Sequence, residues 1–202
     1  MEAMNLELRR LLLTEHTKSA IAELRTLAYS PKFGDRLRSE ALTWNRHDDE
    51  SFHFGAYVDQ KLVSTIRLTR VERPDPFETL MQLSAQDPFA SLPCWVLSRA
   101  ATMPEYLGRS VNMKLRSEAY RFILSRRQAS PQPQAQRQEK YVFGTALKDS
   151  QRISFLQSLG YEVQPGRQSW DGYIAATPDE VSTFRLAIDK IESALLMIDP
   201  RR

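Results

Sequence analysis

The chain has 202 residues, 42% of them hydrophobic, so it is long enough for one well-buried core and short for two. Its 28 Lys and Arg against 25 Asp and Glu give a formal net charge of +3, too small to indicate nucleic-acid binding but compatible with an anionic ligand or acidic partner. The single cysteine, Cys94, excludes an internal disulfide and a cysteine-based zinc site. No apolar run approaches the roughly 20 residues that span a bilayer, and the N-terminus lacks the apolar core of a signal peptide, so we expect a cytoplasmic protein without a membrane span.

Up to residue 68 the sequence predicts a strand, a helix and a hairpin. Residues 6–13 are strand-like, and Thr14 is suited to cap the helix that follows. One face of that helix is apolar: Ala20, Ile21, Leu24, Leu27 and Ala28. Two further strand-like stretches, 52–58 and 62–68, are joined by the short connection 59–61, which is typical of an antiparallel hairpin.

The rest of the chain alternates helices and strands. After a helix around 77–85, we expect a central strand over 94–101, a long helix from Val111, a strand over 141–147 and a short helix capped by Asp149. The apolar stripe of the long helix consists of Val111, Leu115, Ala119, Phe122 and Ile123. A capping box at 177–180 predicts a last helix, with this apolar face: Val181, Phe184, Ile188, Ile191 and Leu195.

This order of elements indicates one domain over residues 1–202, with an α/β (α+β) fold in which helices flank a mixed, mostly antiparallel sheet. The stretch 128–138 is rich in Gln, Pro, Ala and Ser, can bury little, and is expected to be a flexible surface loop within that domain. The histidines His16, His47 and His53 lack metal-ligand spacing, so we expect them to face solvent or to hydrogen-bond locally, and we expect no metal site.

An anion site is predicted where the central strand leads into the long helix. The segment Tyr106-Leu107-Gly108-Arg109-Ser110-Val111-Asn112 is a turn that opens a helix. The first N–H groups of a helix lack backbone partners and lie at the positive end of the helix dipole, so phosphate is the ligand that fits best. The candidates for cofactor binding are Leu107, Gly108, Arg109, Ser110, Val111 and Asn112.

This strand, turn and helix resemble the pyrophosphate-binding segment of the GCN5-related acetyltransferase (GNAT) superfamily, and residues 149–161, which end in Leu-Gly-Tyr, resemble that superfamily's stretch ending in Leu-Gly-Phe. At the three positions specified by the superfamily's turn pattern, the chain has Leu107, Ser110 and Asn112. Leu156 stands where many members have the tyrosine that protonates the leaving thiolate. The usual acetyl-transfer chemistry would therefore lack one of its parts.

A narrower resemblance is to the acyl-homoserine-lactone synthases and the related N-acyl amino acid synthases. Their landmarks recur in order: Arg25 with Tyr29 on the first helix, Trp44 followed by Asp48 and Asp49, Thr65-Ile66-Arg67-Leu68 on a strand, and Leu97-Ser98-Arg99 on the central strand. Val96 replaces the glutamate that the synthases carry three positions before the strand arginine.

The resemblance implies an N-acyltransferase that moves a fatty acyl group from an acyl carrier protein or coenzyme A thioester to a small-molecule amine such as an amino acid. That reaction needs a deprotonated amine, donors at the developing oxyanion and two reactants held in line. The catalytic candidates are Asp48, Asp49, Arg67 and Arg99, and the substrate-binding candidates are Arg25, Tyr29, Trp44, Ala101 and Thr102. The backbone near Ala101 and Thr102 would bind the thioester carbonyl, while Asp48 or Asp49 would organise the amine. The three arginines could hold a substrate carboxylate or the acidic cluster, because a guanidinium presents paired donors to a planar anion.

Two alternatives stay open. One is a coenzyme-A-dependent N-acetyltransferase, which Leu156 disfavours, and the other is a non-catalytic protein that binds acyl thioesters. An acidic carrier protein would be favoured as donor by a basic surface along the long helix and the loop after it: Arg109, Lys114, Arg116, Arg121, Arg126, Arg127 and Arg137.

Overall fold

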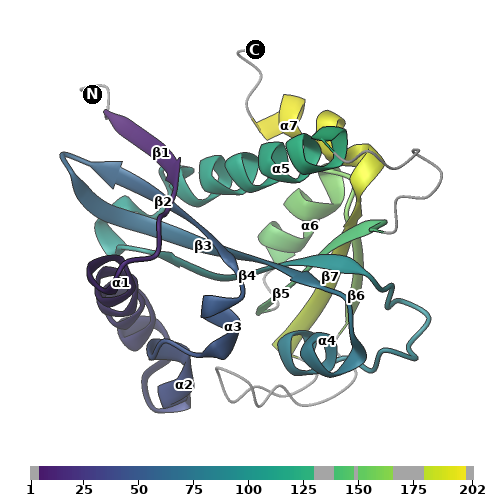
Figure 1. Cartoon of the computed structure of the whole chain (residues 1–202), viewed down its shortest axis with the longest axis horizontal. Helices are drawn as coiled ribbons and strands as arrows, with labels where there is room; N and C mark the ends of the chain where they lie inside the picture. The colour runs from purple at the N-terminus through teal and green to yellow at the C-terminus, as the bar shows by residue number, and fades with distance from the viewer. Residues whose placement is uncertain (1–4, 130–138, 148–149, 166–179, 199–202) are drawn as a thin grey trace.

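Within the residues that the structure describes, seven strands form one mixed sheet with helices on both faces (Figure 1). The structure is a computed structural model that describes residues 5–129, 139–147, 150–165 and 180–198. Neighbouring strands are antiparallel except for β4 and β5, which are parallel, so the expected mixed, mostly antiparallel sheet is confirmed. In spatial order the strands are β1 (Leu6–Arg10), β2 (Phe52–Val58), β3 (Lys61–Val71), β4 (Cys94–Thr102), β5 (Tyr141–Leu147), β7 (Val181–Ala187) and β6 (Glu162–Pro165).

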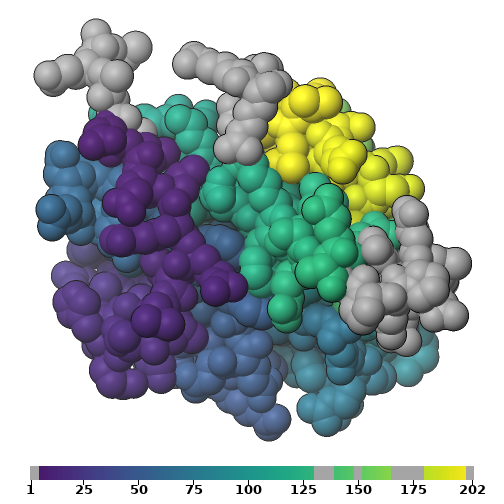
Figure 2. All heavy atoms as spheres, turned by 45° about the horizontal axis from the view of Figure 1, so that its top comes forward, coloured from purple at the N-terminus to yellow at the C-terminus, as the bar shows by residue number. Residues whose placement is uncertain are grey.

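The helices divide between the two faces of the sheet. They are α1 (Glu15–Phe33), α2 (Ser39–Leu42), α3 (Arg46–Asp49), α4 (Pro74–Met81), α5 (Val111–Ala129), α6 (Ser150–Ser158) and α7 (Ile191–Ile198). The connections from β4 through α5 to β5, and from β5 through α6 to β6, run in the same direction, and right-handed crossovers put both helices on one face. In agreement, Arg116 of α5 donates to the hydroxyl of Tyr161, just after α6, at 3.3 Å. The outer side of α5 forms surface between β1 and α7 (Figure 2).

The side chains of strand β2 point alternately to the two faces of the sheet. Phe52 and Phe54 point to α5, where their ring centroids lie 4.6 and 5.8 Å from that of Phe122. His53, between them in sequence, points to the opposite face and hydrogen-bonds the backbone carbonyl of Asp48 on α3. The face opposite α5 therefore carries α1, α3 and α4, and it also carries the polar cluster described below.

Two local sequence signals are confirmed. The hydroxyl of Thr14 accepts a hydrogen bond from the N–H of Thr17 and caps α1. Asp59 and Gln60 both have positive φ, 48° and 64°, as expected for a tight turn whose twist matches that of the flanking strands β2 and β3. One residue of the predicted apolar face of α1 departs from it, because Leu27 is 43% exposed.

The predicted last helix is wrong over its first part. Residues Val181–Ala187 form β7, which pairs with β5 on one side and β6 on the other, and only Ile191–Ile198 are helical. The spacing of Val181 and Phe184 suggested a helical face, but Val181, Ser182, Thr183 and Phe184 are all buried, so apolar periodicity does not distinguish a helix from this strand. Residues 177–179 of the predicted capping box lie outside the described residues.

The predicted loop over 128–138 begins later than expected, because α5 continues to Ala129. Its remaining residues, 130–138, lie outside the described part of the chain, as does the predicted cap Asp149. The predicted glycine end of α6 is confirmed, since Gly160 has a φ of +88°.

Candidate active site

Strands β4 and β5 pair at only two positions, Trp95 with Val142 and Val96 with Phe143. Beyond Val96, β4 continues to Thr102 while β5 continues to Leu147, without further pairing between them. Because this parallel pairing ends at Val96, the edge of β4 that faces β5 has no paired strand over residues 97–102 in the described part of the chain. Ala101 and Thr102, whose backbone is expected from the sequence to bind the thioester carbonyl, lie along this edge of the gap between the two strands.

A bulge in β4 decides which backbone groups face that gap. Ser98 pairs with Arg67 and Ala101 pairs with Thr65, so Arg99 and Ala100 together stand opposite Ile66. Beyond the bulge, the N–H of Met103 bonds to the carbonyl of Val63 at 2.9 Å. Hydrogen-bonded and non-hydrogen-bonded pairs alternate along an antiparallel ladder, so Thr102 belongs to a non-bonded pair and its N–H points away from β3, toward the gap.

The side chains agree with this assignment of Thr102. In a non-hydrogen-bonded pair the side chains approach closely, and the hydroxyl oxygens of Ser64 and Thr102 lie 2.7 Å apart. Ser64 also donates to the carbonyl of Ala101 at 2.9 Å. The backbone on both sides of the Thr102 N–H is therefore held by β3.

The predicted anion turn follows β4 directly. Gly108 and Ser110 have positive φ values of 75° and 58°, and the carbonyl of Ser110 accepts from the N–H of Lys114, so Ser110 is the N-cap of α5. The N–H groups of Val111, Asn112 and Met113 then have no carbonyl acceptor within the helix. Leu107, Gly108, Arg109 and Ser110 are exposed, and Val111 is buried and anchors the helix start. The turn thus presents open N–H groups beside the end of β4.

On the opposite face of the sheet, Asp48 is a fully buried carboxylate that accepts four hydrogen bonds. Arg25 donates through both terminal nitrogens, at 2.8 and 3.1 Å, and Arg67 donates at 3.0 Å. The fourth donor is the N–H of Asn45, which together with the Asn45 side chain forms a capping box on the one-turn helix α3. Arg25 and Arg67 are themselves fully buried. Of the two partners left open for the arginines, a substrate carboxylate or the acidic cluster, Arg25 and Arg67 bind the second, through Asp48.

Opposing effects act on the pKa of Asp48. Burial alone would raise it, but the hydrogen bonds from Arg25 and the charges of Arg67, Arg25 and Arg99 outweigh burial and keep the pKa of Asp48 well below its usual range. The carboxylate is ionised at neutral pH and has no accessible surface, which favours an organising role over proton transfer.

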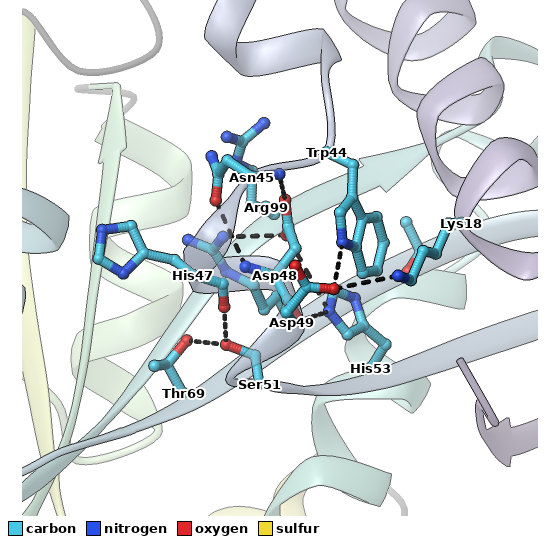
Figure 3. A network of polar contacts seen from close by, with 12 residues as sticks. Lys18, Trp44, Asn45, His47, Asp48, Asp49, Ser51, His53, Thr69 and Arg99 are labelled. Carbon is cyan, nitrogen blue, oxygen red and sulfur yellow. Dashed lines mark hydrogen bonds and ion pairs between the residues drawn. The ribbon is translucent and has the colours of Figure 1, made fainter. Parts of the chain in front are cut away.

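Asp49, the next residue, faces the other way. Its carboxylate accepts a hydrogen bond from the indole N–H of Trp44 at 2.8 Å and lies 3.2 Å from the ammonium of Lys18 (Figure 3). These contacts lower the pKa of Asp49. The Trp44 ring stacks on His53 with centroids 4.9 Å apart. The side chain of Asp49 is 54% exposed, so of the two predicted acidic residues it is the one a solute can reach. Tyr29 lies further along α1, where its ring meets Phe33 edge to face.

Arg99 is 6% exposed and reaches the segment between α1 and α3. Its guanidinium donates to the backbone carbonyls of Glu40, at 2.6 Å, and Ala41 in α2. Arg67 donates through its Nε to the hydroxyl of Ser98, the residue before Arg99. The cluster and the β4 bulge are therefore joined by Ser98 and Arg99.

Sequence reasoning missed His53 as a member of this cluster. It is 1% exposed and hydrogen-bonds the Asp48 carbonyl, so of the two alternatives given for the histidines, solvent exposure or a local hydrogen bond, His53 has the local hydrogen bond. The alternation of β2 carried the signal, because a residue between two inward-facing phenylalanines must face the other covered side.

The pH dependence of stability tests this placement. Burial lowers the pKa of His53 to about 4, against about 6.5 in an unfolded chain. Between these values the unfolded chain binds a proton that the folded protein does not, so the free energy of unfolding should fall by about 3 kcal/mol as pH drops through this window. In His53→Gln, whose amide can still donate to the Asp48 carbonyl, denaturant titrations should show this loss removed. The exposed His16→Gln should keep the wild-type profile, and an unchanged profile in His53→Gln would contradict the placement.

The basic surface expected along α5 does not include Arg116. Arg116 is 3% exposed and packs between the Tyr161 hydroxyl and the Phe184 ring, 5.7 Å from the ring centroid. Arg121 is partly buried and paired with Glu118. Arg109, Lys114 and Arg126 are exposed, and Arg137 lies outside the described residues.

Comparison with known proteins finds similar solved structures but no match by sequence. No protein family and no curated protein matches the chain. Among solved structures, FeeM, an N-acyl amino acid synthase from uncultured soil microbes, aligns with a TM-score of 0.67 and 12% identity over 99% of this chain and 100% of its own. The fold is that of the GCN5-related acetyltransferases. The fold expected from the sequence is thereby confirmed.

Two further solved structures give lower TM-scores than FeeM. BjaI, a coenzyme-A-dependent acyl-homoserine lactone synthase, gives a TM-score of 0.60 and 12% identity over 96% of this chain and 90% of its own. The ribosomal-protein-S18-alanine N-acetyltransferase from Escherichia coli gives 0.53 and 11% identity over 91% and 94%. Both resemblances noted in the sequence are thus represented among proteins of similar structure.

Two of the replaced positions are occupied by core residues: Leu156 at the tyrosine of the GCN5-related pattern and Val96 at the glutamate of the synthases. Leu156 is 3% exposed in the cluster beneath α6, and Val96 is 1% exposed between Thr69 of β3 and Phe143 of β5. Among the described residues, no group of three or more His, Cys, Asp or Glu side chains could hold a metal ion, and no helix is both long and apolar enough to cross a membrane.

Proposed function

We propose that the protein is an N-acyltransferase that moves an acyl group from a pantetheine thioester, on coenzyme A or an acyl carrier protein, to the amine of a small molecule. The observation that carries the proposal is the divergence of β4 and β5, with the Thr102 N–H turned toward the gap and the open N-terminus of α5 beside it. One backbone donor is thus aimed where a thioester carbonyl can lie, and three are aimed where a phosphate can lie.

The donor would bind along this line. Its phosphate would accept from the N–H groups of Val111, Asn112 and Met113, where the helix dipole favours an anion. Its pantetheine arm would enter the gap between β4 and β5 and bring the thioester carbonyl to Thr102. The N–H of Thr102 then stabilises the negative charge that develops on the carbonyl oxygen during attack.

The amine would approach from the face that carries α1 and α3. Asp49 is the exposed carboxylate there and would attract and orient an ammonium group, while Asp48 holds Arg25 and Arg67 and thereby keeps α3 against the sheet. Transfer forms a C–N bond and breaks the C–S bond. The amine loses a proton and the leaving thiolate takes one up, so no covalent bond to the enzyme is required.

The burial of Leu156 and Val96 at the replaced positions supports one alternative, a protein that binds acyl thioesters without turnover. The deciding experiment incubates the purified protein with acyl coenzyme A and acyl carrier protein of several chain lengths and a panel of amines. Mass spectrometry should detect N-acyl products together with stoichiometric free thiol. Tight binding of intact thioester without product would support the binding protein, and acetyl transfer alone would support a coenzyme-A-dependent N-acetyltransferase.

The carrier protein can be distinguished from coenzyme A by charge. Arg109 and Lys114 are exposed beside the anion turn, whereas Arg126 is exposed at the far end of α5, about 18 Å from Lys114 at 1.5 Å per residue. If an acidic carrier protein docks at the turn, Arg109→Glu with Lys114→Glu should lower kcat/KM for acyl carrier protein about 10-fold or more at low salt, and less at moderate salt. The loss for acyl coenzyme A should be smaller.

The control for this test is Arg126→Glu, which changes the net charge of the same helix away from the turn. It should have little effect with either donor. Equal losses with both donors in the double variant would contradict carrier-protein docking at the turn, and would leave coenzyme A as the favoured donor.

A further inference from the structure

Arg99 belongs to two parts of the molecule at once. Its backbone lies in the left-handed region, with φ +54°, at the bulge of β4. That conformation is strained for a residue other than glycine and persists only where its surroundings hold it. Its buried guanidinium holds the backbone carbonyls of Glu40 and Ala41 in α2.

Helix α2 depends on these contacts. It has a single turn, Ser39–Leu42, which is too short to be stable by its own hydrogen bonds. Its last carbonyls lack N–H partners within the helix, and a guanidinium at a helix C-terminus satisfies them and complements the dipole. Arg99 therefore supplies the end of a helix in the segment 34–45, which leads into Trp44 and the Asp48 cluster.

The bulge in turn determines the direction of the Thr102 N–H. The extra residue in β4 shifts the alternation of the ladder by one position. Without it, Thr102 would stand opposite Val63, in a hydrogen-bonded pair, and its N–H would point to β3 instead of the gap. The conformation of Arg99 thus decides whether the gap contains an oxyanion donor.

We propose that Arg99 is a positioning residue that couples the segment 34–45, on the amine side, to the β4 bulge that orients the Thr102 N–H, on the thioester side. This inference rests on the proposed function for its catalytic consequence. When α2 is in place, its carbonyls hold the Arg99 side chain, which holds the bulge and the donor. If these contacts are lost, the bulge loses that support and the oxyanion donor is no longer fixed.

The first test uses Arg99→Gly, because glycine adopts positive φ without strain, so the bulge can still form, while the side-chain contacts that fix it in one conformation are lost. We expect kcat to fall about 10- to 100-fold, as for the loss of an oriented oxyanion donor, while KM for the acyl donor stays within about 3-fold because the α5 anion turn is untouched. Added guanidinium ion at non-denaturing concentration should restore part of kcat in this variant and not raise that of the wild type. Arg9→Gly, on edge strand β1, is the control and should show neither the loss nor the rescue.

The second test measures the coupling without turnover. Amide hydrogen exchange in Arg99→Gly should become faster both at residues 39–43 and at Ala101 and Met103, whose N–H groups bond to β3 beyond the bulge, although the two segments are distant in sequence. Faster exchange in only one of them, or unchanged kcat in Arg99→Gly, overturns the coupling. A wild-type protein that transfers no acyl group would refute the proposed function, and the exchange data would then decide the coupling by themselves.

Discussion

Asp48→Asn should lower the free energy of unfolding by about 3–5 kcal/mol, the loss expected when one partner of a buried ion pair is removed and the others remain. Arg25 and Arg67 are fully buried and both direct donors at this carboxylate, so a neutral amide would leave two buried charges without compensation. The amide can accept at one atom only, and its NH2 group would point at a donor. Equilibrium denaturation measures the effect.

The matched control for Asp48→Asn is Asp49→Asn, one residue away. The side chain of Asp49 is about half exposed, and its partners Lys18 and Trp44 can bond to water instead, so the change in stability should stay below about 1 kcal/mol. Equal effects of the two substitutions would contradict the assignment of Asp48 as the organising carboxylate.

Acid should act on wild-type stability through Asp48 in a separate pH window from His53. The pKa of Asp48 is depressed on folding, so its contribution is present above the unfolded value of about 4 and is lost only as pH falls below it. In Asp48→Asn this low-pH loss should disappear, while the loss due to His53 above about pH 4 should remain.

Ser110→Asp should raise KM for the acyl donor about 10-fold or more with little loss of stability. Ser110 is the exposed N-cap of α5, and Asp serves at N-caps as well as Ser does and tolerates positive φ. Its carboxylate would stand where the donor's phosphate is proposed to bind, and two like charges about 4 Å apart repel by about 1 kcal/mol in water and about 4 kcal/mol near a protein surface. Steady-state kinetics against acyl coenzyme A measures the change.

Ser110→Asn is the isosteric neutral partner of this substitution and should keep a donor KM close to that of the wild type. Comparing the two isolates charge from shape, which a proline at this position would not do, because proline cannot adopt the φ of +58° found at Ser110. If Ser110→Asp and Ser110→Asn have the same KM, the phosphate does not bind at the start of α5.

The sequence by itself determined the features that depend on neighbours along the chain. Thr14 caps α1, Asp59 and Gln60 form the hairpin turn, and the turn around Gly108 leads into α5, because caps and turns are set by the conformational preferences of a few consecutive residues. The order of these elements predicted the mixed, mostly antiparallel sheet, and the resemblance of the turn and of residues 149–161 indicated the GCN5-related fold. Failures occurred where an element is covered on both sides, as for β7, since apolar residues on both faces remove the periodicity that identifies a strand.

The partners of the polar residues were decided only by the tertiary structure. Asp48 meets Arg25 and Arg67 across 23 and 19 residues of chain, which left open whether these arginines would hold a substrate or the protein's own carboxylate. Arg116 was expected on the surface and is buried, because the long arginine side chain reaches over α5 to Tyr161. The bulge at Arg99 depends on the pairing of β4 with β3 and on the carbonyls of α2. No local pattern encodes it, since each of these contacts forms only when the sheet and its covering helices assemble.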